Sequence, residues 1–384
     1  MQNSTDKKQT RMAATIDAIK VAAITNRPFV LVGADGEGKT SYLRQMCRDL
    51  DWGFYPLIGA NMDPTDIGGL PNKGPDGELR RDPLHRAIRE AIEYAREGKH
   101  YLILIDEVNG SPDSVLASIQ TMLSEWTAGD VELCQKYVHF GCAMNPTDIA
   151  TAGKDFQPPM CTRLIWIPFQ QEFEFWCNGM VSQGWAPTEQ AGLVIGFIRA
   201  KGIPSEHSDG VFRDPPTREF LNKPRRTPRT WTNLANLLAE AEAQNVSRQS
   251  IRILVSGTIG EGPATEFMDY WKERDSIAPP EEILARAETY PFPARLDHCY
   301  MMYNSVASYV LRTKKVEDWK ALWTLVGRSD ESIHKAEAML AARICIRILT
   351  TPEGKHLREH LPKEVKVFKE MFQDLGLLTG ASSA

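Results

Sequence analysis

One eight-residue string near the start of the chain constrains its fold more than any other feature. Residues 33–40 read GADGEGKT and fit the pattern G-x-x-x-x-G-K-[ST] of a phosphate-binding loop. The apolar run FVLV at 29–32 precedes the loop as a buried strand would, and an amphipathic helical pattern follows it. In this context the backbone N–H groups of the loop and the helix N-terminus bind a phosphate. The alternative is a glycine-rich turn that binds no ligand.

The pattern assigns a role to each residue of the loop. Lys39 would reach the β- and γ-phosphates of a nucleotide, and Thr40 would hold Mg²⁺. The expected nucleotide-binding residues are Gly33, Ala34, Asp35, Gly36, Glu37, Gly38, Lys39, Thr40 and, on the following helix, Tyr42. Because Asp35 and Glu37 are acids in a loop that binds an anion, we expect their side chains to point away from the phosphates.

A second motif supplies what hydrolysis of the nucleotide needs. Residues 102–107 read LILIDE, an aliphatic strand that ends in two acids, which is the Walker B arrangement. Parallel strands direct their carboxyl ends to the same crevice, so these acids should lie beside the loop. Asp106 would hold Mg²⁺, and the catalytic residue Glu107 would orient and deprotonate the attacking water. Alternatively, both acids only cap the next element.

A third polar residue follows a further strand. Residues 142–146 read CAMNP, so Asn145 stands at the end of the apolar run 138–144. At the tip of a central strand between the two Walker strands, Asn145 would contact the γ-phosphate or the attacking water. The alternative is a turn residue before proline, a position that asparagine often takes.

Apolar runs and helical patterns alternate along the first part of the chain. Strands are expected at 28–33, 54–60, 101–106, 138–144 and 164–169, and helices at 11–25, at 84–97 and from 112 with Ser111 as N-cap. This alternation predicts an α/β fold with a five-stranded parallel sheet and helices on both faces. Only helical patterns follow, so the expected domains are a nucleotide-binding α/β subdomain at 1–170, an all-α lid at 171–272 and a helical C-terminal region at 273–384.

Composition limits the class of protein. The chain has 384 residues, 42% hydrophobic and 25% charged, as is ordinary for a soluble globular protein. A net charge of −5 gives no general excess of Lys and Arg for nucleic acid. The aliphatic stretches are too short to span a bilayer, and the N-terminus lacks the apolar core of a signal peptide. Seven cysteines without a C-x-x-C pair indicate free thiols, so a cytoplasmic protein without a membrane partner is expected.

Together, the motifs resemble those of the AAA+ ATPases, and in detail those of the MoxR branch. The resemblance is carried by the loop at 33–40, MDPTDIGGLP at 62–71, DEVN at 106–109, AMNP at 143–146 and TPRTW at 227–231. It covers residues 10–272 and is weak beyond them. It implies a P-loop NTPase fold, ATP and Mg²⁺ as ligands, and a homo-oligomeric ring, a hexamer, with nucleotide at the subunit interfaces.

The resemblance also assigns residues that composition and spacing do not. Arg163 matches the arginine that a neighbouring subunit contributes to the site, although Arg-Leu stands here where the family has Arg-Phe. Arg229 matches the sensor-2 arginine of the lid, with Arg226 in reserve. Asn61 matches the polar residue that restrains Glu107 until a partner binds.

Two further segments are expected to form hairpins. Residues 72–83 contain Pro-Asp-Gly, which is the turn chemistry of a hairpin, and residues 127–138 would form the hairpin before the strand expected at 138–144. The MoxR branch carries insertions at both places, so the resemblance implies hairpins that project toward the ring pore or a client. Plain surface loops are the alternative for each.

These features leave several functions open. The first is a MoxR-like ATPase that remodels or activates a partner protein, often one with a von Willebrand A domain. The second is a nucleic-acid motor or a DNA-processing ATPase of the restriction, phage or phage-defence type, which the acidic net charge disfavours. The third is a scaffold that binds nucleotide without turnover. The pattern HLREH at 356–360 would place two histidines on one helix face, as in a zinc protease, but too little chain follows for a third ligand.

Overall fold

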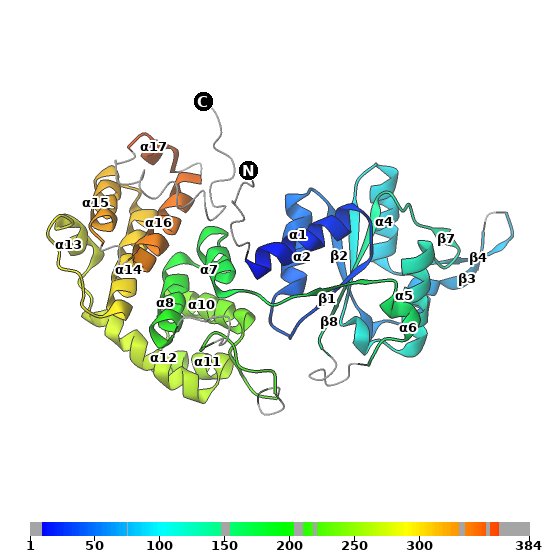
Figure 1. Ribbon diagram of the computed structural model, residues 1–384, viewed down its shortest axis with the longest axis horizontal. Helices are drawn as coiled ribbons and strands as arrows, with labels where there is room; N and C mark the ends of the chain where they lie inside the picture. The colour runs from blue at the N-terminus through cyan, green and yellow to red at the C-terminus, as the bar shows by residue number, and fades with distance from the viewer. Residues whose placement is uncertain are drawn as a thin grey trace, which may run out of the picture. The chain divides into compact units, whose positions relative to one another are not determined.

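The chain forms two compact units in the computed structural model (Figure 1). The structure describes residues 10–74, 76–146, 154–202, 210–217, 220, 222–329, 335–350 and 354–360. The first unit extends to Glu172, and the second begins at Phe173. The predicted boundary after residue 170 is two residues from this division.

A five-stranded parallel sheet forms the centre of the first unit. In order across the sheet, its strands are β2 (Gly53–Ile58), β5 (Tyr101–Asp106), β8 (Val138–Met144), β1 (Phe29–Val32) and β9 (Ile165–Pro168). All five lie where apolar runs predicted strands, which confirms the predicted fold class. Strand β8 lies between β5 and β1, so the residue that follows β8 is next to both Walker motifs.

Helices cover both faces of this sheet. On one face, α4 (Arg86–Arg96) and α5 (Asp113–Glu125) share an apolar core with the strands. The opposite face carries α1 (Arg11–Ile24) and α2 (Lys39–Asp49). The interior strand β5 is therefore buried on both sides, which explains its uninterrupted aliphatic sequence.

The start of α5 differs from the prediction. Pro112, not Ser111, is the N-cap, and its side chain cannot accept a hydrogen bond. Ser111 is fully buried and closes the short 3₁₀ turn η2 (Val108–Gly110) through its backbone N–H. Local capping rules assign Ser111 to the start of α5, but in the structure Ser111 ends the turn that follows the Walker B acids.

Both predicted hairpins are present. The first has strands β3 (Leu70–Lys73) and β4 (Leu79–Asp82), and the second has β6 (Thr127–Ala128) and β7 (Val131–Glu132). Figure 1 shows the first hairpin projecting from the sheet of its unit. Asp130 joins the two hairpins, because its carboxylate accepts the Arg81 N–H at 2.8 Å and its own N–H donates to the Arg81 carbonyl at 2.9 Å.

The segment MDPTDIGGLP has a local structural explanation. Asp63 caps the short helix α3 (Pro64–Gly68), and Asp66 returns a bond to the Asp63 backbone. Gly69 has φ 71° and faces the Asp82 carbonyl oxygen, which would lie 2.3 Å from a Cβ atom. The two acids and the glycine therefore shape the entry into the first hairpin.

The second unit is helical. The remaining helices of the chain are α6 (Pro158–Cys161) in the first unit, and α7 (Phe173–Ser182), α8 (Thr188–Lys201), α10 (Pro228–Ala243), α11 (Arg248–Ile259), α12 (Glu261–Glu273), α13 (Pro280–Ala285), α14 (Leu296–Thr313), α15 (Val316–Gly327), α16 (Lys335–Thr350) and α17 (Lys355–Arg358). Short 3₁₀ turns are η1 (Gly59–Asn61) and η3 (Arg274–Ser276). Thr227 caps α10 as predicted, in a reciprocal box with Thr230.

One apolar core runs through the whole helical unit. Four of its tryptophans are fully buried: Trp176, Trp231, Trp319 and Trp323. Helices on either side of the predicted boundary between 272 and 273 share this core, so that boundary stays a prediction from sequence. Among the helices of the described ranges, none has the length and apolar character that crossing a membrane requires.

Candidate functional site

The predicted phosphate loop joins β1 to α2 and has a backbone that only glycines adopt readily. Gly36 and Gly38 both have positive φ, 80° and 84°. Gly38 is the N-cap of α2 and offers no side-chain acceptor, which leaves the first N–H groups of the helix without a side-chain cap. A loop of this shape, leading into a helix N-terminus, fits a bound phosphate.

Lys39 lies at the centre of this loop. Its side chain is buried, and its ammonium donates to the carbonyl oxygens of Gly33 and Ala34 at 2.6 and 2.9 Å. A third bond, of 3.0 Å, goes to Oδ1 of Asn145. Asn145 therefore lies beside the loop, at the end of β8, where the sequence predicted it.

Thr40 and Asp106 bring the two Walker motifs together. The Thr40 hydroxyl donates to Oδ2 of Asp106 at 2.5 Å, while Oδ1 of Asp106 accepts the backbone N–H of Glu107 at 3.0 Å. A hydroxyl and a carboxylate side by side are the oxygen ligands that Mg²⁺ takes in proteins. These two residues therefore fit the predicted magnesium site.

Glu107 follows β5 in a left-handed conformation, with φ 52° and ψ 37°. This backbone turns an exposed carboxylate out of the strand direction at the edge of the site. Asn61 is also exposed, in the turn η1 after β2. The restraint of Glu107 by Asn61 that the resemblance implies is not seen, since no hydrogen bond joins these two described residues.

The two acids of the loop do point away from its centre. Glu37 is buried and its Oε2 accepts the backbone N–H of Gln171 at 2.8 Å, whereas Asp35 is exposed. Tyr42 is partly buried, with its ring centre 5.8 Å from that of Phe169. Burial, followed by the charges of Asp17 and Asp49, raises the pKa of the Tyr42 hydroxyl. Its contact with nucleotide stays a prediction.

Asn109 has no role in the sequence motifs, yet the structure brings it into the site. Asn109 is 3% exposed, and its Nδ2 donates to the backbone carbonyl of Asn145 at 3.0 Å. This bond ties the turn after Walker B to the end of β8. The sequence offered one signal for this contact, which is an asparagine close to a buried aliphatic strand. A buried side-chain amide needs a hydrogen-bond partner, so a polar contact near the strand end could be expected.

Arg163 is exposed at the start of β9, just after α6. Its guanidinium donates to the Pro159 carbonyl at 2.6 Å and to the Ser124 hydroxyl, both within this chain. A role at a neighbouring subunit would require these two bonds to be exchanged for phosphate contacts. That role stays a prediction.

The two sensor-2 candidates, both in the helical unit, have different surroundings. Arg226 forms an ion pair with Asp214, whose side chain is only 3% exposed, and also donates its backbone N–H to that carboxylate at 2.7 Å. Arg229 is exposed in the first turn of α10, and no hydrogen bond from it to another described residue is found. Of the two, Arg229 has the side chain available for a ligand.

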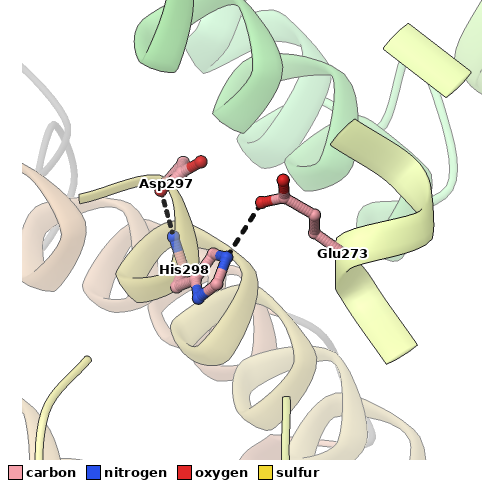
Figure 2. A group of neighbouring side chains, drawn as sticks. All are labelled: Glu273, Asp297 and His298. Atoms are coloured by element: carbon pink, nitrogen blue, oxygen red, sulfur yellow. Dashed lines mark hydrogen bonds and ion pairs between the residues drawn. The ribbon is translucent and has the colours of Figure 1, made fainter. Parts of the chain in front are cut away.

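Two other groups of ionisable residues have side chains of the kinds that bind metal ions. Figure 2 shows Glu273, Asp297 and His298, whose ligand atoms lie within 4.8 Å of one another. Arg295 forms ion pairs with both carboxylates, so a cationic group already occupies this cluster and offsets part of its negative charge. The two histidines of HLREH do not share a helix as expected, because α17 ends at Arg358, and His356 bonds instead to the Lys314 carbonyl at 3.0 Å.

Comparison with known proteins identifies the domain that contains the site. The sequence model of the AAA domain (dynein-related subfamily) matches residues 28–160. A search of curated proteins finds no match. The matched range contains the phosphate loop, both Walker B acids and Asn145, so these residues lie in the part of the chain that is similar to the AAA domain and has a P-loop fold.

Solved structures with similarity to this chain include ATPases and DNA motors. A mutant of RuvB from Thermotoga maritima is 11% identical, with 73% of this chain and 77% of that chain covered and a TM-score of 0.37. A protein from Cytophaga hutchinsonii described as a candidate ATPase is 14% identical, with coverages of 81% and 79% and a TM-score of 0.32. The Thermotoga maritima RuvB Holliday junction branch migration motor is 10% identical, with coverages of 72% and 74% and a TM-score of 0.34. Assignment of the domain rests on the family match and not on these similarities.

Proposed function

We propose that this chain, whose residues 28–160 form an AAA domain, is a MoxR-like ATPase that hydrolyses Mg-ATP. It acts as a homo-oligomeric ring, a hexamer, in the cytoplasm, and uses the cycle to remodel or activate a partner protein. The observation that carries the proposal is the contact between Thr40 and Asp106, residues 66 positions apart, because it unites the loop and Walker B at one point.

Each polar group of the site has a task in this reaction. Bound Mg²⁺ neutralises charge on the phosphate oxygens. Thr40 and Asp106 supply its protein oxygens, and Lys39 exchanges its carbonyl partners for the phosphates that enter the loop. Asn145, already bonded to Lys39, is placed to orient the γ-phosphate or the attacking water.

The remaining groups act on the attacking water and on the charge that develops. Glu107 takes the proton of the water as a general base, since its carboxylate is exposed at the end of β5. Arg163 of a neighbouring subunit and Arg229 of the lid stabilise the charge on the transferred phosphoryl group. A guanidinium suits this task because it contacts several phosphate oxygens at once.

The partner protein meets the two joined hairpins. The first hairpin projects from its unit and exposes two large apolar side chains, Leu70 at 51% and Leu79 at 70%. Exposed apolar groups on a projecting element are typical of interaction surfaces. Within the MoxR branch, a von Willebrand A domain protein is the expected kind of partner.

Nucleotide turnover by the purified chain and two variants tests the proposal. We expect Lys39→Ala to abolish ATP binding, and Glu107→Gln to retain ATP but not hydrolyse it. Lys99→Ala removes an exposed lysine that forms an ion pair with Glu97, and it should behave as the unaltered protein. Absence of turnover under every condition, in a chain that stays monomeric with ATP, would contradict the proposal.

The same trap variant distinguishes the kind of partner. Glu107→Gln in ATP should retain a protein in a pull-down, and that protein should stimulate the ATPase rate of the unaltered chain. Stimulation by DNA, falling steeply with salt, would instead favour a nucleic-acid motor, because phosphate contacts release counterions.

A further inference from the structure

The phosphate loop contacts a segment far from it in the sequence. Residues 169–172, which we call the strap, lead from β9 to Phe173, where the helical unit begins. The Phe169 carbonyl oxygen would lie 2.0 Å from a Cβ at Gly33, so the loop and the strap approach closely. The ring of Tyr42 on α2 also contacts Phe169.

Glu37 makes the polar contact between the loop and the strap. Its side chain is 3% exposed, and its Oε2 accepts the backbone N–H of Gln171 at 2.8 Å. Gln171 is itself 5% exposed, and its Oε1 would lie 3.7 Å from a Cβ at Gly38. Both the backbone and the side chain of Gln171 therefore lie against the loop.

A carboxylate is unfavourable here for nucleotide binding alone. A negative charge within the loop repels the phosphates, and a buried carboxylate is costly unless hydrogen bonds satisfy it. A bond from a backbone N–H to a carboxylate is shorter and stronger than one between neutral groups. The presence of Glu37 is therefore explained by what it does for the strap.

We propose that Glu37 is a positioning residue that transmits nucleotide binding from the phosphate loop to the strap. The inference rests on the proposed function, because it requires a bound nucleotide. When phosphate orders the loop between Gly36 and Gly38, Glu37 is fixed, and the bond to Gln171 fixes the entry into the helical unit. The far end of the strap is held separately, since Glu172 accepts the Met12 N–H at 3.0 Å.

Three variants separate the charge of Glu37 from its contact. Glu37→Gln removes the charge but keeps an acceptor oxygen at the same reach. Glu37→Asp keeps the charge but is one methylene too short for Gln171, and Glu37→Ala removes both. Glu172→Ala is the matched control, because it releases the strap from α1 and leaves its contact with the loop.

Hydrogen exchange of the Gln171 amide, with and without Mg-ADP, is the direct readout. In the unaltered protein we expect nucleotide to slow this exchange by at least about tenfold, as for an amide held in a closed structure. Glu37→Gln and Glu172→Ala should keep this response, whereas Glu37→Asp and Glu37→Ala should lose it.

Kinetics and affinity provide a readout that a merely structural residue would not give. In Glu37→Asp and Glu37→Ala, kcat should fall by about tenfold without a rise in KM for ATP, since positioning and not binding is lost. Glu37→Gln should bind ADP more tightly than the unaltered protein, because one repelling charge is gone.

Two results with the variants would overturn the inference. The first is that Mg-ADP slows exchange of the Gln171 amide in Glu37→Asp or Glu37→Ala as much as in the unaltered protein. The second is that Mg-ADP does not slow this exchange in Glu37→Gln. Should Glu37→Ala not fold, Glu37→Asp decides alone. If isothermal titration finds no ADP binding by the unaltered chain, the proposed function fails as well. If the unaltered chain hydrolyses ATP normally but Mg-ADP does not slow exchange of the Gln171 amide, only this inference is overturned.

Discussion

At the scale of single residues, the candidate site depends on polar atoms whose partners lie on different elements of the fold. Asp106 uses one carboxylate oxygen for Thr40 and the other for the backbone of Glu107. Asn145 receives bonds from Lys39 at its side chain and from Asn109 at its backbone. Glu107 is exposed, so it is the acid that remains available to a water molecule.

Replacing Glu107 should therefore affect chemistry more than binding. We expect Glu107→Gln to lower kcat for ATP hydrolysis by roughly 10²–10⁴-fold, the usual contribution of a general base. Its Kd for ATP, measured by fluorescence titration, should stay close to that of the unaltered protein. Glu132→Gln, at an exposed glutamate of β7, is the control. Unchanged turnover in Glu107→Gln would show that Glu107 is not the general base, and absence of turnover in the unaltered protein would instead favour a scaffold that binds nucleotide without hydrolysis.

The two lid arginines should separate stability from activity. Arg226→Ala leaves the Asp214 carboxylate buried without its ion-pair partner, so unfolding in urea should become easier by roughly 2–4 kcal/mol. Arg229→Ala removes an exposed side chain, so its stability should change by less than about 0.5 kcal/mol while ATP turnover falls. If Arg229→Ala lowered stability and Arg226→Ala lowered only ATP turnover, Arg226 would be the sensor-2 residue and Arg229 the structural one.

At the scale of elements, an aromatic stack closes the amino end of the central strands. His139 at the start of β8 is 2% exposed and stacks on Trp52, with ring centres 4.2 Å apart. Its Nε2 lies 2.7 Å from Nδ1 of His100, which precedes β5. Burial and the neighbouring His100 lower the pKa of His139 to about 4.

This stack predicts a loss of stability in mild acid. The unfolded chain takes up a proton at His139 near pH 6.5, and the folded chain does so only near pH 4, so folding becomes less favourable as pH falls between these values. The effect is at most on the order of 3 kcal/mol. Urea unfolding followed by tryptophan fluorescence should show this slope, and His139→Phe should reduce it. Equal slopes in both proteins would contradict the prediction.

The junction of the two hairpins gives a second prediction at this scale. Asp130→Ala removes the carboxylate that accepts the Arg81 N–H, so that amide should exchange faster with solvent by about tenfold. Hydrogen exchange detected by mass spectrometry measures it. Basal ATP hydrolysis should be unchanged, while stimulation by a protein partner should weaken. A loss of basal turnover would instead connect the hairpins to the catalytic site.

At the scale of the whole molecule, the proposed ring predicts activity in mixtures. Rings of Glu107→Gln have no base, and rings of Arg163→Ala have no neighbouring arginine, so each alone should be inactive. In a mixed ring, an interface is complete where an Arg163→Ala subunit supplies Glu107 and its Glu107→Gln neighbour supplies Arg163. Random mixing in equal amounts places these two subunits in that order at about a quarter of the interfaces of a head-to-tail ring. Recovery of turnover after mixing would support the shared site. Its absence, with mixed rings detected by native mass spectrometry, would show that Arg163 acts within its own subunit or not at all.

The sequence was sufficient to locate the strands of this protein. Strand periodicity is a local signal, and it predicted the sheet correctly. Glycine spacing and the acids after an aliphatic run are local signals too, and the structure brings Lys39, Thr40 and Asp106 together, while their roles in the reaction stay predictions. Turn chemistry predicted the first hairpin, whereas the second was implied by the resemblance. Each of these features depends on neighbours within a few positions along the chain.

Contacts between distant segments could not be inferred in this way. The pairing of Arg226 with Asp214, the bond of Asn109 to the end of β8, and the contact of Glu37 with the strap all join residues that no local pattern relates. Ser111 is a further residue whose place was not predicted, because it ends the turn formed by Val108–Gly110 and does not cap α5. Which polar groups meet is determined by the packing of sheet and helices, because burial forces each polar group to find a partner wherever the folded chain provides one.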